Sequence, residues 1–274
     1  MKNVHEITTF SLSAEELALA LSMINKPDLG RQILNTVAPQ MSDEQIDARL
    51  TSASHSLVAR GLADISLRGN SELDSMLEKA IFPMAKYDQL LQISSSNDDN
   101  QQMRVVYSYQ NNFFAAHWVE KGVVNIIDYG SYASFADYVS SFFSEIGKKG
   151  SDKSVAADHK ITLGTLGKAM IERSQKKQVN EMLFESGLSE ELAGQLTSDI
   201  LKQKMRGSLM LFDINSETTP DTAHNAAKET ILMLRGPQRS WLFEFANTHD
   251  EEVAHIQLVN RKTFEKVLRQ TILH

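Results

Sequence analysis

The amino-acid sequence predicts an α+β fold that contains one scaffold twice. The segment 42–61 returns as 189–207 with a similar order of polar and apolar residues. A single offset relates two matched pairs within these segments, Thr51 with Thr197 and Arg60 with Arg206. An offset that stays constant over such a stretch indicates an internal duplication and not one shared tripeptide.

A second pair of similar segments lies toward the end of the two halves of the chain. The segment 124–139 resembles the segment 253–268. A single offset again relates two matched pairs, Val124 with Val253 and Phe135 with Phe264. This offset is smaller than the first, so the second half is expected to lack an element that the first half retains. The helix predicted from Ser71 to Ala85 is the candidate for that element.

The repeat predicts two related halves, residues 1–147 and 161–274, which pack as one body with pseudo-twofold symmetry. Each half is expected to be an antiparallel sheet flanked by helices. Residues 148–160 are predicted to be a linker, because glycine, serine and charged residues begin this segment and make a poor core.

Cap residues predict the helices of the first half. Ser13 and Glu16 have the spacing of a capping box, so a helix is expected to begin near Ala14 and to end at the break 26–30. Two further helices are expected at 31–37 and 43–59, the second opened by Ser42 and ended by Gly61.

Runs of β-branched and aromatic residues predict the strands of the first half. A short strand is expected at 62–67, before the helix 71–85. An antiparallel meander follows at 87–93, 103–109, 113–119 and 123–128, with polar turns at 97–100 and 110–112. A helix at 131–146, with aromatic residues on one side, is expected to cover this sheet.

The second half repeats this order with local changes. Helices are expected at 163–184 and 190–205, strands at 208–214, 230–235, 240–245 and 253–258, and a closing helix at 262–273. Gly236 to Gln238 predicts a turn. Residues 215–227 contain many polar and turn-forming residues, so this segment is expected to be a surface loop or a short helix.

Composition excludes several classes of protein. The chain has 274 residues, of which 42% are hydrophobic and 23% charged, so it is large enough for one big domain or two small ones. It has no cysteine, which excludes disulfides and is compatible with the reducing cytoplasm, where we expect the protein to act. Neither a signal peptide nor an apolar stretch long enough to span a membrane is visible. A net charge of −7 disfavours binding to nucleic acid.

The familiar local signatures of enzymes are missing from the sequence. It contains no nucleophile elbow, phosphate-binding loop, dinucleotide glycine fingerprint or His-Glu-x-x-His helix. We therefore expect a binding protein that is not an enzyme and that uses no cofactor and no metal.

A winged-helix transcriptional regulator is the alternative. A helix that ends in the segment 57–64 and is followed by a strand is how many winged DNA readers place their recognition helix. The charge of the would-be recognition helix disfavours this reading. It carries Asp43, Glu44 and Asp47 against Arg49, whereas entry into the major groove calls for cations and amide or guanidinium donors.

Three segments carry a resemblance to a known family: Leu12-Ser-Ala-Glu-Glu-Leu17, Leu57-Val-Ala-Arg-Gly-Leu-Ala-Asp64 before a helix that ends at Pro83, and Arg206-Gly207 ahead of a strand-rich end closed by a helix. With these segments the chain resembles the EspG family of cytosolic chaperones of type VII secretion. The resemblance covers nearly the whole chain. It implies an EspG-like pseudo-twofold α+β fold and a chaperone that keeps a secreted helical partner of the PE/PPE type soluble before export.

The resemblance also implies where such a partner would bind. Members of the family use the sheet, a loop between its early strands and the later helical segment. By strand order, the matching loop is Asn97, Asp98, Asp99 and Asn100, and the matching helices are those expected at 163–184 and 190–205. A solvated turn is an equally good explanation of the loop, because acidic and amide residues favour turns for local reasons. Exposed apolar residues on the helices are expected to be the better signal of an interface.

Overall fold

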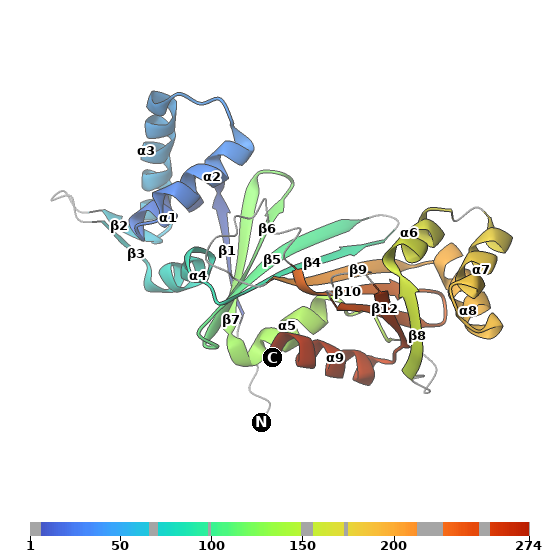
Figure 1. Cartoon of the computed structure of the whole chain (residues 1–274). Coiled ribbons are helices and arrows are strands. Elements are labelled where there is room, and N and C mark those ends of the chain that lie inside the picture. Colours follow the sequence, from blue (N-terminus) through green and yellow to red (C-terminus); the bar gives the residue numbers. More distant parts are fainter. Residues whose placement is uncertain are drawn as a thin grey trace. The chain divides into compact units, whose positions relative to one another are not determined.

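A computed structural model describes residues 7–65, 71–97, 100–148, 156–172, 175–212, 227–246 and 253–273 (Figure 1). The chain forms two compact units. Unit 1 comprises Met1–Leu90 and Arg104–Phe135, and unit 2 comprises Leu91–Met103 and Ala136–His274. Helices and antiparallel strands make up both units, which confirms the predicted α+β class.

The sheet of unit 1 has the strand order β1-β7-β6-β5. These strands are β1 (Thr8–Ser13), β7 (Val124–Ser131), β6 (Phe113–Glu120) and β5 (Gln101–Tyr109), the last belonging to unit 1 from Arg104 onward. Strand pairs β1–β7, β6–β7 and β5–β6 are antiparallel, as in Phe10 opposite Ile127. The sequence analysis predicted β5, β6 and β7 but missed β1, a half-buried edge strand in which Leu12 is fully buried.

Among the described residues, four helices belong to unit 1: α1 (Ala14–Met23), α2 (Pro27–Val37), α3 (Asp43–Ala59) and α4 (Ser75–Ala85). The capping box predicted at Ser13 is present, because the Glu16 amide donates to Ser13 Oγ and the Ser13 amide donates to Glu16. Ser42 and Gln45 form a second capping box at the start of α3. Helices α1 and α4 bury leucine and isoleucine side chains against Ala115 and Ile127 of the sheet.

The segment before α4 corrects one prediction. The strand expected at 62–67 is present as β2 (Ala63–Ile65), but it pairs with β3 (Ser71–Leu73), which the sequence analysis assigned to the following helix. The helix begins later because Asp74 is its cap, with Oδ1 accepting hydrogen bonds from the amides of Met76 and Leu77.

The sheet of unit 2 has the strand order β4-β9-β10-β11-β12-β8. These strands are β4 (Gln89–Ser96, in unit 2 from Leu91), β9 (Met205–Phe212), β10 (Ala227–Arg235), β11 (Ser240–Ala246), β12 (Val253–Leu258) and β8 (Ala156–Thr162). Strand β8 begins inside the segment 148–160 that was predicted to be a linker. Ile161 explains the strand, since it is buried and pairs with Ala254, while the polar residues around it suit an edge.

In the part of unit 2 that the structure describes there are five helices: α5 (Phe135–Phe142, in unit 2 from Ala136), α6 (Leu163–Ile171), α7 (Lys176–Glu185), α8 (Glu190–Leu201) and α9 (Arg261–Leu273). A short 3-10 turn, Tyr132–Ser134, precedes α5, so the helix predicted at 131–146 is shorter than expected. Helices α6, α7 and α8 pack on the sheet face that carries Trp241, Phe243 and Ile256. The predicted loop at 215–227 falls almost entirely outside the described residues. The relation of 1–147 to 161–274 as duplicated halves stays a prediction.

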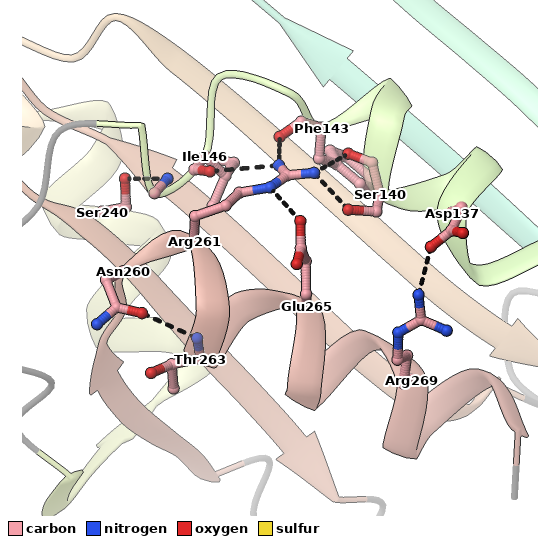
Figure 2. Close-up of polar contacts among 11 residues, drawn as sticks. Asp137, Ser140, Phe143, Ile146, Ser240, Asn260, Arg261, Thr263, Glu265 and Arg269 are labelled. Carbon is pink, nitrogen blue, oxygen red and sulfur yellow. Dashed lines mark hydrogen bonds and ion pairs between the residues drawn. The ribbon is translucent and has the colours of Figure 1, made fainter. Parts of the chain in front are cut away.

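Arg261 at the start of α9 fixes the end of α5 in unit 2 (Figure 2). Its guanidinium donates to the carbonyl oxygens of Ser140, Phe143 and Ile146, with N–O distances of 3.0, 3.1 and 3.5 Å, and forms an ion pair with Glu265. A helix end leaves carbonyl groups without partners inside the helix, so a cation at this place satisfies them.

Candidate partner-binding site

The predicted loop residues Asn97 and Asn100 form a closed turn after β4, on the part of the chain that belongs to unit 2. The Asn100 amide donates to Asn97 Oδ1 at 2.8 Å, and the Asn97 amide donates to the Asn100 carbonyl oxygen at 2.9 Å. Both side chains are exposed, whereas Asp98 and Asp99 lie outside the described residues. The turn is therefore stable by its own hydrogen bonds, and a role in binding stays a prediction.

The helices expected at 163–184 and 190–205 also lie in unit 2, where the described residues form a helical group, α6, α7 and α8. The helix expected at 163–184 is two helices, α6 and α7, because the sequence between Ile171 and Val179 has no apolar residue to hold a helix on the core. The helix expected at 190–205 ends at Leu201, and Met205 already belongs to β9. Thr162 caps α6 and Ser189 caps α8 through side-chain acceptors for backbone amides.

Exposed apolar side chains occur on this helical group. Ile171 at the end of α6 is 82% exposed, Phe184 near the end of α7 is 54% exposed, and Leu163 at the start of α6 is also exposed. The buried neighbours Leu166 and Leu183 define the stripes that face the core. Large apolar residues this accessible mark candidate contact points for another protein.

The sequence contains a signal for the exposure of Ile171 and Phe184, which the prediction above missed. Met170 and Ile171 are consecutive apolar residues, and so are Leu183 and Phe184. Successive residues of a helix are turned by about 100° from each other, so a narrow core stripe cannot take both members of such a pair. In each pair the first member packs on the core and the second is exposed.

Asp199 anchors α8 to the sheet of unit 2. Its side chain is 1% exposed, and Oδ2 accepts hydrogen bonds from Arg239 Nε at 2.7 Å and from Trp241 Nε1 at 2.9 Å. The turn between β10 and β11, predicted at Gly236 to Gln238, approaches the same carboxylate. A Cβ atom at Gly236 would lie 2.1 Å from Asp199 Oδ1, so only glycine allows this approach. These contacts hold the helical group rigidly.

One acceptor beside Ile171 lacks a donor. Glu172 Oε2 is buried and has no hydrogen-bond partner among the described residues. A buried carboxylate oxygen without a donor costs free energy.

Three other expectations concern DNA, the membrane and metal ions. The helix considered as a DNA reader is α3, and the structure exposes its acidic residues Asp43, Glu44 and Asp47. Within the described residues, no helix is both long and apolar enough to cross a membrane. No described group of three or more histidine, aspartate or glutamate side chains is placed to hold a metal ion.

Comparison with known proteins identifies the family. Residues 9–268 match the family described as uncharacterised protein YfjC. The chain belongs to the YfjC family. No curated protein matches this YfjC-family chain.

A solved structure shows the fold of the YfjC-family chain. The type VII secretion system chaperone EspG5 of Mycobacterium tuberculosis, in complex with the PE25–PPE41 dimer, is similar over 97% of this chain and 96% of its own. The TM-score is 0.60 and the sequence identity is 10%. The predicted EspG-like fold is therefore confirmed.

Proposed function

We propose that this protein is a cytoplasmic chaperone of the EspG type, which binds a secreted helical partner of the PE/PPE kind and keeps it soluble before export. Two findings support the proposal. The fold resembles that of EspG5, the chaperone in complex with PE25–PPE41, over nearly the whole length of both chains. The observation that carries it is the exposure of Ile171 and Phe184 on the helices that the resemblance had implied.

The chemistry of the helical group suits a helical partner. Burying one exposed large apolar side chain stabilises a complex by about 1.5–3 kcal/mol, so Ile171 and Phe184 together can supply the centre of an interface. The Asp199 anchor holds α8 in place before binding, which lowers the entropy lost on association.

In the proposed complex, the turn formed by Asn97 and Asn100 contributes polar contacts to the interface. The exposed side chain of Asn100 offers an amide donor and acceptor, as the rim of an interface does. The role requires binding and release only, so it includes no catalytic step, cofactor or metal.

Co-expression tests this function. The chain is produced together with secreted helical-pair proteins encoded beside it, and the partner is counted in the purified complex. Ile171→Asp and Phe184→Asp place a charge at the proposed contact, and we expect each to reduce recovery of the partner by about tenfold or more. Val123→Asp is the matched control, because Val123 is 62% exposed in unit 1 and takes no part in the site.

Two results would refute the proposal. One is that no neighbouring helical protein forms a stoichiometric complex with the wild-type chain. The other is that the control loses the partner as strongly as the two site variants do. A gel shift with genomic DNA at low salt tests the alternative function, because a winged-helix regulator would bind DNA under these conditions.

A further inference from the structure

The outer face of α9 in unit 2 carries a row of cations. Lys262, Lys266 and Arg269 are exposed, at spacings of four and three residues, and therefore lie on the same side of the helix. The apolar residues Phe264, Leu268 and Ile272 of the helix are buried, whereas Leu273 at its end is exposed. The helix thus presents charge to solvent and keeps its apolar side in the core.

A hollow of about 430 Å³ follows this face. Its lining residues are Lys262, Glu265, Lys266, Arg269 and Gln270. They form two rows with a spacing of four residues: one through Lys262, Lys266 and Gln270, the other through Glu265 and Arg269. A groove between two such rows is the feature into which a second helix packs its own row of side chains.

The second row is held in place by unit 2 itself (Figure 2). Glu265 pairs with Arg261 at 2.7 Å, and Arg269 pairs with Asp137 of α5. In the described part of the chain no ion pair includes Lys262 or Lys266, so the first row keeps two uncompensated positive charges. One row is therefore tied to unit 2 by exposed ion pairs, and the other carries two solvent-exposed ammonium groups.

We propose that the α9 groove binds an acidic helix of another protein, a contact separate from the α6–α8 site and independent of the proposed function. Lys262 and Lys266 lie about 6 Å apart along the helix axis. Carboxylates four residues apart on a partner helix have the same spacing and complete the two missing ion pairs. The charge of −7 on the whole chain makes this local cationic face selective, because acidic proteins are repelled elsewhere.

Other anionic partners fit this face less well. A membrane surface calls for apolar side chains that can enter the lipid, and those of α9 are buried apart from Leu273. Nucleic acid presents a long line of phosphates, whereas the cationic row covers two turns of one helix on an acidic chain.

Fluorescence anisotropy with designed peptides tests the proposal. The first probe is an alanine-based helical peptide with glutamate at every fourth position, and the second has glutamine at the same positions. We expect the acidic peptide to bind the full chain, with an affinity that falls as salt rises, and the glutamine peptide to bind at least about tenfold more weakly. The double variant Lys262→Glu, Lys266→Glu should weaken binding of the acidic peptide by about tenfold or more.

The matched control is the double variant Lys176→Glu, Lys177→Glu on α7. It changes the net charge by the same amount, at two exposed lysines of the same unit. We expect it to change the affinity by no more than about twofold. Thermal unfolding followed by circular dichroism checks that all variants are folded.

Several outcomes would overturn the proposal. These are equal weakening in both double variants, no binding of the acidic peptide at low salt, and equal binding of the two peptides. Tighter binding of anionic vesicles or duplex DNA than of the acidic peptide, lost in the α9 variant, would assign the face to a membrane or to nucleic acid instead. Dimerisation of the wild-type chain that the α9 variant abolishes, measured by sedimentation, would make a second copy the occupant.

Discussion

Asp199 in unit 2 and Glu16 in unit 1 are both buried carboxylates held by an arginine, yet they connect different parts of their units. Asp199 is 1% exposed and joins helix α8 to Arg239 and Trp241 at the start of β11. Glu16 is 5% exposed and joins α1 to the end of α3 through Ser56 and Arg60. The first is a link from helix to sheet and the second a link from helix to helix.

The two sites differ in the source of their hydrogen bonds. Glu16 accepts one bond from the Ser13 amide, three residues away, as part of a capping box. The donors to Asp199, Arg239 Nε and Trp241 Nε1, lie about forty residues further along the chain. The arginines differ too, because the side chain of Arg60 is 41% exposed and that of Arg239 is 22% exposed. Water can therefore replace part of the Glu16 site but not the indole donor at Asp199.

Asp199→Ala should have the largest effect on stability. It leaves the buried Trp241 indole N–H without its acceptor and the partly exposed Arg239 without its carboxylate. Removal of one member of a buried ion pair costs about 3–5 kcal/mol, and we expect about 3 kcal/mol here because Arg239 is partly exposed. Urea unfolding followed by circular dichroism measures the loss.

Asp137→Ala is the control for this measurement. Asp137 pairs with Arg269 in the same unit, but both side chains are about half exposed or more. An exposed ion pair contributes about 0–1 kcal/mol, so the midpoint of unfolding should hardly change. Equal losses in the two variants would show that burial does not distinguish these carboxylates.

Glu16→Gln should have a smaller effect that depends on pH. Burial acts to raise the pKa of Glu16, but the hydrogen bonds from Ser56, Ser13 and Arg60 outweigh it, and the pKa lies below its ordinary value. The ionised form therefore stabilises the folded state. We expect a loss of about 2 kcal/mol at neutral pH, as for hydrogen bonds to a charged group.

The pH dependence of that loss follows from the sign of the shift. With a lowered pKa in the folded state, the contribution of Glu16 is complete above its ordinary pKa and disappears as pH falls through the lowered value. Unfolding curves of wild type and variant should therefore converge in acid. Glu15→Gln, which weakens the more exposed pair with Arg49, should give a loss below about 1 kcal/mol. A difference between wild type and Glu16→Gln that is constant with pH would contradict the account.

The same contrast between local and distant contacts explains what the sequence predicted. The capping residues Ser13 and Ser42 lie next to the helices that they open, and both were recognised from the sequence. The strands of the meander were also found, because their residues carry β preference themselves. Strands β1, β3 and β8 were missed, since they are an edge, a three-residue piece and a polar edge whose pairing comes from elsewhere in the chain.

The candidate binding site divides in the same way. Exposure of Ile171 and Phe184 could have been read from the consecutive apolar pairs of their helices. The Asp199 anchor could not, because no local pattern connects an aspartate in α8 with an indole on β11. The turn at Asn97 and Asn100 was correctly placed between two strands, and its hydrogen bonds are local.

Glu244 on β11 contrasts with Asp199 and Glu16, because one oxygen of its carboxylate has no hydrogen-bond donor among the described residues. This oxygen, Oε1, is buried. Burial raises the pKa of Glu244, while His255 on the neighbouring strand acts in the opposite direction and Glu229 adds to the rise. If donors are what make Asp199 and Glu16 stabilising, the charge of Glu244 must destabilise the fold.

Glu244→Gln should therefore stabilise the protein at neutral pH, by about 1 kcal/mol, since it removes a poorly solvated charge. With a raised pKa in the folded state, the penalty sets in as pH rises above the ordinary carboxyl value and is complete above the raised one. The gain should appear in urea unfolding at neutral pH and vanish in acid, where Glu244 is protonated in both states. Glu229→Gln, which leaves the buried oxygen of Glu244 in place, should give a smaller gain. A loss of stability in Glu244→Gln would mean that this carboxylate has a stabilising partner after all.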